Sequence, residues 1–567
     1  MSVNPPNTVP ASASAGTATR LPVKHFGIYL AYAPTVDLRH QGLGRYLSAF
    51  LGGAAERADL RFTVLCPSWS QRDLREFFSA ENIAPERYDL RSPGGQPLIL
   101  RAYEAWRAWR PRKKKPPLRQ RLLDALRAAR SGFLRGLEER LVHAHSLASA
   151  LPLLLYLALA LGMAAVLALP LLLAAALLGL GAVAAGALVR LARPSRALIA
   201  RASAVLANPK EDGFVLRLYQ RMAQVEEERM QRLAMQLGEV QAWYCPTAFW
   251  PAFHRLPGPK LMCVPDLVLG EFPVDYAGVG GDRFLATFDA VETAIREGSH
   301  FVVYSETVKW ETLVGRYAVP AANVAVVRHA PNDLRRWVHI GEFEKTEETA
   351  RGYAGMLFES ALRRSPNQAY TGFFRNSSAR FLFYASQFRP NKNLISLLRA
   401  YEHLLRKRLL GHKLILTGDA DAFPPVRDFI AAHGLQNEVL CLPRLPVQEL
   451  AACYRLADLA VNPSLSEGGC PFTFCEALSV GTPAVMSRIA VTEEVLTDEA
   501  VREASLFDPY DWQDMAQHIE WALAHRAELL AIQRPVYETL SRRNWSDVVL
   551  EHVDILERIA RNDEANT

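Results

Sequence analysis

The chain has 567 residues, which is too long for one ordinary domain and fits two or three. Half of the residues are hydrophobic, so a large core is possible and global disorder is excluded. The net charge of +6 is unevenly spread, because residues 101–146 hold 13 Lys or Arg against 4 Asp or Glu. A basic block in an otherwise near-neutral chain indicates an anionic partner, either a lipid surface or a nucleic acid.

The cysteines and the first residues say little about function. Seven cysteines give an odd total without a CxxC pair, so neither a disulfide framework nor a zinc site is indicated. A reducing compartment is the simpler interpretation. Residues 1–22 are rich in Ser, Ala, Thr and Pro without an apolar core, which predicts a disordered tail.

The first predicted elements alternate between strand and helix. Apolar runs at 26–31 and 62–66 have the length of buried strands, and a helix pattern covers 45–51 between them. A glycine-containing loop, Gln41-Gly-Leu-Gly44, separates the first strand from this helix. This order predicts a βαβ unit of a parallel sheet, and we assign residues 23–100 to the first part of an N-terminal α/β domain.

An uncharged segment then interrupts this domain. Residues 147–189 form a run of 43 residues without a charged side chain, mostly Leu and Ala. One helix of that length would be about 65 Å long, roughly twice the hydrocarbon thickness of a bilayer. Pro170 leaves 23 residues before it and 19 after it, which predicts a hairpin of two transmembrane helices. A re-entrant hairpin fits the same residues, because the neighbours of Pro170 are poor turn formers.

Basic residues flank the uncharged run on both sides. Arginines stand before it at 130, 135 and 140, and after it at 190, 193, 196 and 201. By the positive-inside rule both ends lie in the cytoplasm, so the number of crossings is even. Residues 118–142 interleave Leu and Phe with Arg, as in an amphipathic helix that binds anionic lipids. We therefore expect residues 101–212 to attach the chain to a membrane of the bacterial inner membrane type, with both soluble domains cytoplasmic.

Two other interpretations fit parts of this segment. The first is a hairpin buried inside a large helical protein, which needs a bigger core than this chain offers. The second is nucleic-acid binding by the basic block, although the block adjoins the uncharged run directly. We expect membrane lipids, and no nucleic acid, as partners.

The α/β pattern resumes after the insert. Residues 213–335 complete the N-terminal domain, with a helix at about 215–238 and strands expected at 242–245, 260–264, 301–305 and 324–327. Residues 336–378 are assigned to a linker or insert, and residues 379–540 to a C-terminal domain. That domain has strands expected at 380–385, 413–417, 439–442, 459–462 and 484–486, separated by helices at 394–408, 426–433, 447–455 and 471–479. Residues 541–567 form the last segment. Ligands of such sheets bind at the carboxyl ends of the strands.

Glycines and charged residues gather in loops that follow predicted strands. Gly42 and Gly44 would let backbone N–H groups approach a phosphate at a helix start, and an ordinary turn explains them equally well. In Gln387-Phe-Arg-Pro-Asn-Lys-Asn393, Arg389 and Lys392 place two cations before a helix. Such cations suit a diphosphate whose charge builds as it leaves, and a solvated turn is the alternative.

A third loop carries two carboxylates. Glu467 stands in a glycine-containing loop, and Glu476 stands on the helix that follows. Carboxylates in these places accept hydrogen bonds from sugar and ribose hydroxyls. The whole stretch, residues 464–483, is the most specific motif of the chain.

These motifs resemble the retaining glycosyltransferases of family 4, which have the GT-B fold of two Rossmann-like domains facing a cleft. The resemblance covers nearly all of the chain outside the tail and the insert, and it is strongest over 380–509. Glu476-Ala-Leu-Ser-Val-Gly-Thr-Pro matches the second half of the family signature. Glu467 stands in the place of the first glutamate, with eight residues instead of seven between the two.

The chain departs from the family pattern in two further places. Lys392-Asn393 matches, whereas Ser386-Gln387 stands where relatives have Gly-Arg, and Arg389 is positioned to supply the missing charge. Asp266 lies where many members have a His-Asp pair near the acceptor, and the histidine is missing.

The resemblance implies a GT-B enzyme with an inserted helical transmembrane hairpin in its N-terminal domain. It also implies that residues 541–567 form a C-terminal helix that crosses back to the N-terminal domain. The catalytic residues it implies are Arg389, Lys392, Glu467 and Asp266. The donor-binding residues are Gly42, Gly44, Gln387, Arg444, Gly468, Gly469, Phe472 and Glu476. The implied reaction is a retaining hexosyl transfer without an obligatory metal or cofactor, from a UDP- or GDP-sugar to a lipid-linked or other glycan acceptor. The alternative is a catalytically silent GT-B protein that acts as a membrane assembly partner.

Overall fold

The computed structural model describes residues 23–34, 36, 42–55, 57, 59–98, 100–101, 105, 157–158, 214–341, 345–365 and 379–566. The chain divides into two compact units, residues 1–95 with 223–567, and residues 96–222. The predicted membrane hairpin and the amphipathic stretch before it fall in the second unit. Apart from residues 157 and 158, they lie outside the described residues. Within the described ranges, no helix combines the length and the apolar character that a membrane crossing requires.

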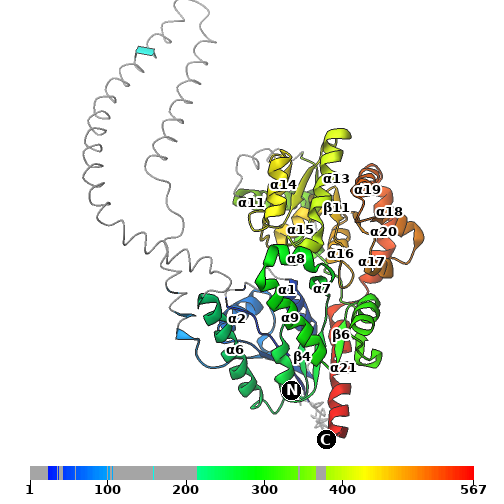
Figure 1. Ribbon diagram of the computed structural model, residues 1–567. Helices are drawn as coiled ribbons and strands as arrows, with labels where there is room; N and C mark the ends of the chain where they lie inside the picture. Colours follow the sequence, from blue (N-terminus) through cyan, green and yellow to red (C-terminus); the bar gives the residue numbers. More distant parts are fainter. Residues whose placement is uncertain are drawn as a thin grey trace, which may run out of the picture. The chain divides into compact units, whose positions relative to one another are not determined.

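The first unit contains two parallel β-sheets (Figure 1). The N-terminal sheet has the strand order β3-β2-β1-β4-β5-β6-β7, and the C-terminal sheet has the order β10-β9-β8-β11-β12-β13. The strands of the first are β1 (Lys24–Tyr29), β2 (Leu60–Leu65), β3 (Tyr88–Arg91), β4 (Trp243–Cys245), β5 (Lys260–Cys263), β6 (Phe301–Val303) and β7 (Val324–Val326). Those of the second are β8 (Phe381–Tyr384), β9 (Lys413–Leu416), β10 (Val439–Cys441), β11 (Leu459–Asn462), β12 (Ala484–Ser487) and β13 (Leu506–Phe507). The predicted α/β architecture is confirmed.

The helices connect and cover these strands. In the N-terminal part they are α1 (Gly42–Ala54), α2 (Gln71–Ala80), α6 (Phe214–Ala234), α7 (Val268–Glu271), α8 (Pro273–Gly280), α9 (Asp282–Glu297) and the π-helix η4 (Val308–Arg316). In the C-terminal part they are α10 (Arg335–Val338), α11 (Thr346–Arg364), α13 (Leu394–Lys407), α14 (Pro424–Ala432), α15 (Val447–Leu456), α16 (Phe472–Ser479), α17 (Ala490–Val495), α18 (Glu499–Ser505), α19 (Trp512–Ala524), α20 (Arg526–Leu540) and α21 (Trp545–Asn566). Short 3-10 turns are η2 (Pro85–Arg87), η3 (Pro251–Arg255), η5 (Ala321–Asn323) and η7 (Pro390–Lys392).

Two strands were not predicted from the sequence pattern. β3 is an edge strand with the sequence Tyr-Asp-Leu-Arg, and its four residues are half-buried or exposed. β13 has two residues and pairs only with β12. A short or half-polar edge strand lacks the continuous apolar run that marks a buried parallel strand.

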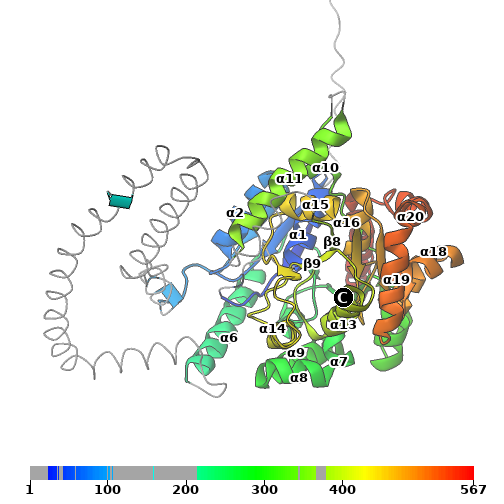
Figure 2. The same ribbon diagram turned by 90° about the horizontal axis from the view of Figure 1, so that it is seen from above.

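Helices cover both faces of each sheet, as the apolar character of the strands requires. In β1, Phe26 and Ile28 join a core with α1, α2 and α21, while Tyr29 joins a core with α6 and α9 on the other face. In β8, Phe383 packs toward α11, α15 and α16, and Tyr384 packs toward α13 and α19. Figure 2 shows α11 beside α15, so the predicted linker 336–378 contributes a helix to the C-terminal core.

The last helix returns to the N-terminal sheet. Figure 1 draws α21 in red beside blue and green elements, and α21 packs on α1. At Gly53 of α1, an added Cβ would lie 2.5 Å from the backbone carbonyl of Trp545. The two helices can approach so closely because position 53 has no side chain.

A buried histidine lies beneath this crossing. His552 of α21 is fully buried, its Nδ1 lies 2.7 Å from the Val548 carbonyl oxygen, and its Nε2 lies 3.4 Å from the Tyr46 hydroxyl. The Tyr46 hydroxyl in turn lies 2.9 Å from that of Tyr244. Burial lowers the pKa of His552 to about 4, so the ring is neutral in the folded chain at neutral pH.

We expect this histidine to make stability fall with acidification. In the unfolded chain His552 gains a proton below its ordinary pKa of about 6.5, whereas the folded chain holds it neutral down to about 4. The contribution of His552 to the free energy of unfolding is therefore complete above about pH 6.5. It is lost as the pH falls toward 4, by about 3 kcal/mol in total. Thermal unfolding followed at stepped pH should show this slope in the native chain and a flatter one in His552→Gln. Equal slopes in both proteins would show that His552 is not the source of this pH dependence.

Candidate active site

The candidate site is built from loops at the carboxyl ends of strands in both sheets. The C-terminal sheet contributes residues 385–393 after β8 and 463–471 after β11. The N-terminal sheet contributes residues 264–267 after β5 and 304–307 after β6. This is the edge at which open parallel sheets bind ligands.

Lys392 and Glu467 form an ion pair in this region. The Nζ atom of Lys392 donates to Oε1 of Glu467 at 2.6 Å, and the two side chains are 18% and 20% exposed. Burial disfavours charge on Lys392, but the nearby carboxylates of Glu467 and Asp266 outweigh it and raise the pKa of the ammonium above its usual range. The lysine therefore stays cationic at any physiological pH.

Asp266 and Arg389 belong to the same electrostatic group. Burial raises the pKa of Asp266, while the charges of Lys392 and Arg389 oppose this rise. Arg389 is exposed, and its Nη2 donates to Oε1 of Gln387 at 2.9 Å, so Gln387 orients the arginine. The structure thus brings the four predicted catalytic residues together. In the described part of the chain, no three His, Cys, Asp or Glu side chains converge on a metal-sized site.

The two glycines after Glu467 lie directly against the N-terminal domain. An added Cβ at Gly468 would lie 1.5 Å from the carbonyl oxygen of Pro265, and one at Gly469 would lie 2.9 Å from Cβ of Tyr304. The Ser305 hydroxyl donates to the Gly468 carbonyl oxygen at 2.9 Å. Only glycine fits at position 468, because the backbone of one domain touches that of the other there, while at position 469 the side chain of Tyr304 limits the space.

Phe472 begins α16 and stacks on a histidine of the N-terminal domain. Its ring centroid lies 4.2 Å from that of His329, at an interplanar angle of 29°. Burial lowers the pKa of His329, so the imidazole is neutral at neutral pH. The predicted donor-binding role of Phe472 stays a prediction, and its ring also joins the two domains.

Glu476 is a buried carboxylate with two hydrogen-bond partners. Its side chain is 2% exposed, and Oε1 accepts from Nη1 of Arg45 at 3.2 Å and from Nδ2 of Asn332 at 3.1 Å. Neither partner was singled out from the sequence. Arg45 directly follows the glycine pair 42 and 44, and this adjacency was the available signal.

Asn391 is a further residue that sequence reasoning missed. It is 3% exposed, its Nδ2 donates to the Ser466 carbonyl oxygen at 3.2 Å, and its Oδ1 accepts from the Tyr276 hydroxyl at 2.7 Å. Its backbone carbonyl accepts from the Leu465 amide. Asn391 therefore holds the lysine loop, the glutamate loop and α8 in one arrangement.

The structure places the glycine pair at 42 and 44 in a helix and Arg444 in a loop. The expectation of a loop at 41–44 is wrong for its glycines, because α1 begins at Gly42 and both glycines lie in its first turn. Helix formation starts early because a helix N-terminus tolerates glycine before the apolar face begins. Arg444 is exposed on the loop after β10 with φ 59°, and no described contact joins it to the residues above.

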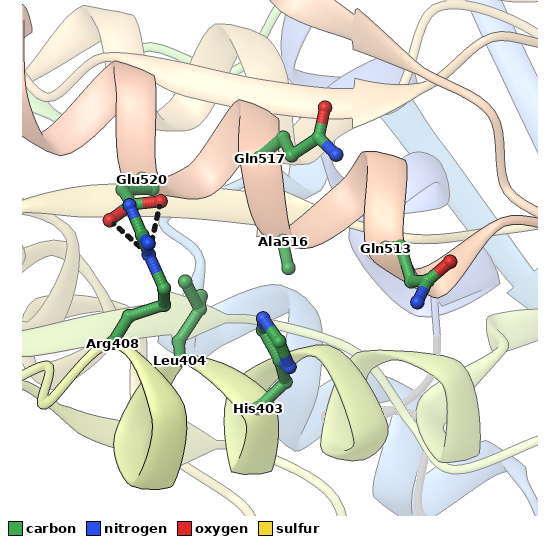
Figure 3. Close-up of a pocket in the computed structure, with 7 residues that line it drawn as sticks. All are labelled: His403, Leu404, Arg408, Gln513, Ala516, Gln517 and Glu520. Carbon is green, nitrogen blue, oxygen red and sulfur yellow. Dashed lines mark hydrogen bonds and ion pairs between the residues drawn. The ribbon is translucent and has the colours of Figure 1, made fainter.

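A cavity of about 440 Å³ lies elsewhere, between α13 and α19. Figure 3 shows His403 of α13 directed toward α19, with Ala516 opposite. Arg408 donates to both carboxylate oxygens of Glu520, at 2.8 and 3.0 Å, and this pair closes one end. The cavity is lined by helices that cover the sheet, whereas the four predicted catalytic residues lie on strand-end loops.

The C-terminal part of the chain matches a known family. Residues 372–535 match the family described as Glycosyl transferases group 1, over the whole C-terminal sheet and its loops. This region is therefore similar to glycosyl transferases group 1. The matched residues include Arg389, Lys392 and Glu467, whereas Asp266 comes from the sheet that precedes them.

Known proteins are similar to a part of this chain or to nearly all of it. The O-antigen chain mannosyltransferase B of Escherichia coli is 30% identical over 141 residues, 24% of this chain and 35% of the relative. The chain thus matches about a third of that relative's length. The structure of the Candida albicans trehalose-6-phosphate phosphatase N-terminal domain is similar with a TM-score of 0.52 and 11% identity, over 95% of this chain and 97% of that one. HepE of Anabaena in complex with UDP and glucose has a TM-score of 0.43 and 16% identity, over 59% of this chain and 83% of that one. The chain has a GT-B-like α/β fold with two parallel sheets.

Proposed function

We propose that the protein is a membrane-attached retaining glycosyltransferase that moves a hexose from a nucleoside diphosphate sugar to a lipid-linked glycan. The similarity of residues 372–535 to glycosyl transferases group 1 supports glycosyl transfer. The observation that carries the proposal is the Lys392–Glu467 pair, which lies beside Asp266 at the carboxyl edges of both sheets. A buried cation next to a carboxylate suits a ligand that presents both a phosphate and a hydroxylated ring.

The roles of these residues follow from their positions. Lys392 and Arg389 stabilise the diphosphate as negative charge develops on it, which is electrostatic stabilisation of the transition state. When the donor binds, Lys392 turns from Glu467 to the diphosphate, and Glu467 becomes free to accept hydrogen bonds from the sugar. Asp266 reaches the same group from the N-terminal domain, on the side proposed for the acceptor.

The retaining course rests on the resemblance to family 4. In that scheme the leaving diphosphate helps to deprotonate the acceptor hydroxyl on the face from which it departs. The cations at 389 and 392 make this possible, because they hold the diphosphate in place after the bond to the sugar breaks. Neither a metal nor a cofactor is part of this proposal.

The membrane part of the proposal rests on the sequence. The basic residues 101–146 and the uncharged residues 147–189 suit attachment to an anionic membrane, with both soluble domains in the cytoplasm. An acceptor linked to a lipid would then be presented at the same surface. The relative from Escherichia coli is named a mannosyltransferase of the O-antigen chain, so a mannosyl donor belongs in the first tests.

Glu476 provides a test of the donor site. Detergent-purified enzyme would be incubated with UDP-, GDP- and ADP-sugars and membrane lipid extract, and release of the nucleoside diphosphate measured. One donor should be turned over. Glu476→Ala should raise the KM for that donor about tenfold or more, because it removes the carboxylate proposed to accept hydrogen bonds from the ribose of the donor. Arg45 and Asn332 also lose their shared acceptor. Glu476→Gln keeps a carbonyl acceptor and should lose less.

A matched control is Glu449→Gln, which changes a buried glutamate paired with Arg364 in the same domain. It should leave the KM unchanged. If no donor is turned over by the native enzyme, the proposal fails and the alternative, a catalytically silent assembly partner, takes its place.

A further inference from the structure

Two cysteines lie at the start of the helix that carries Glu476. Pro471 is the N-cap residue of α16, so Cys470 precedes the cap and Cys475 lies in the first turn, directly before Glu476. Their Sγ atoms are 3.9 Å apart. Residues at these two helix positions commonly form an apolar contact that fixes the entry of the chain into the helix. Here that contact is made by two thiols.

These two sulfurs differ from the other five. All seven cysteines of the chain are free thiols in the structure, and only Cys441 and Cys470 are partly exposed. Cys470 thus combines access to solvent with a second thiol in contact. The hydrogen bond with Cys470 and burial both raise the pKa of Cys475, so Cys475 keeps its proton. Cys470 is therefore the sulfur that meets an oxidant first.

We propose that Cys470 and Cys475 form a reversible disulfide that switches the donor site off. The oxidant is a low-molecular-weight disulfide such as oxidised glutathione. The Cys470 thiolate attacks one of its sulfurs, forming a mixed disulfide and releasing one thiolate. Cys475 then attacks the Cys470 sulfur, its proton passes to the departing sulfur, and the second small thiol is released. The two protein thiols lose two electrons, and the small disulfide gains them.

The bond acts on the site through the glycine loop. A disulfide bond is about 2 Å long, so the two sulfurs must approach by nearly 2 Å. Cys470 is covalently continuous with Gly468 and Gly469, which touch Pro265 and Tyr304 without space for a Cβ. Movement of Cys470 toward α16 draws this loop, and with it Glu467, away from its place beside Lys392. A displacement of about 1 Å in a catalytic group is enough to lower turnover by about a hundredfold.

Mass spectrometry tests the bond itself. The full chain in detergent is treated with increasing oxidised glutathione, alkylated with iodoacetamide and digested with trypsin. Residues 456–488 form one tryptic peptide that holds Cys470 and Cys475 and no other cysteine. This peptide should lose two hydrogens and take up no alkyl group, and a reductant should restore two alkylation sites. A peptide that stays doubly alkylated, or that only carries glutathione, overturns the proposal.

The switch is measured on the same samples, and it rests on the proposed function. Nucleoside diphosphate release should fall about tenfold or more on oxidation in the native chain and in Cys441→Ser, the control at the other partly exposed cysteine. In Cys470→Ser, oxidation should leave release at its own untreated level. Unchanged release from a native chain that contains the disulfide overturns the switch. A chain that turns over no donor refutes the proposed function alone, because the peptide mass still decides the bond and binding of UDP or GDP to oxidised and reduced chain decides the switch.

Discussion

Replacing Lys392 with methionine should lower turnover of the donor by about a hundredfold to a thousandfold, which is the loss seen when one preorganised charge or donor is removed from a site of developing negative charge. Methionine keeps the length and the apolar stem of the side chain and removes only its ammonium group. Because this group stabilises the diphosphate mainly as it leaves, kcat should fall more than KM rises. Steady-state release of the nucleoside diphosphate measures both.

A simple defect in folding has to be separated from this effect. Lys392→Met leaves the half-buried carboxylate of Glu467 without its partner, whereas the double variant with Glu467→Gln restores neutrality. We expect the double variant to melt near the native temperature and to stay inactive. Lys413→Met is the matched control, since it removes a lysine paired with Glu438 at the amino end of β9, and it should keep full turnover. Native turnover in Lys392→Met would remove the lysine from the mechanism.

The Gly468→Ala variant should lose about a hundredfold in turnover, although it adds a single methyl group. The new Cβ would lie 1.5 Å from the Pro265 carbonyl oxygen, a distance at which the two backbones must separate. The hydrogen bond from the Ser305 hydroxyl to Gly468 then breaks, and Glu467 moves with the loop. A shift of about 1 Å in a catalytic group is enough for a loss of this size.

Gly411→Ala provides the comparison for this variant. Gly411 lies in the same domain before β9, and an added Cβ there meets no atom within 4 Å. It should retain native turnover and native stability. If Gly468→Ala were as active as Gly411→Ala, the close approach of the two domains would have no part in turnover.

The sequence by itself determined most of the strands and the residue types of the loops that follow them. A nearly continuous apolar run of strand length marks β11 to the residue at Leu459–Asn462, because a parallel strand covered on both faces is mostly apolar. The lysine at 392 and the glutamates at 467 and 476 were recognised because they follow such strands. Periodicity and residue type are local properties, and local properties can be read without a fold.

The tertiary structure alone decided which residues meet. Arg45 and Glu476 are 431 positions apart, and Ser305 and Gly468 are 163 apart, so no local pattern announces either pair. The edge strand β3 is likewise held by its neighbour β2 instead of by its own composition. The reason the glycines at 468 and 469 must be glycines lies in another domain, at Pro265 and Tyr304. Contacts of this kind arise only when two sheets bring their carboxyl edges together, since packing between distant segments and not local preference selects them.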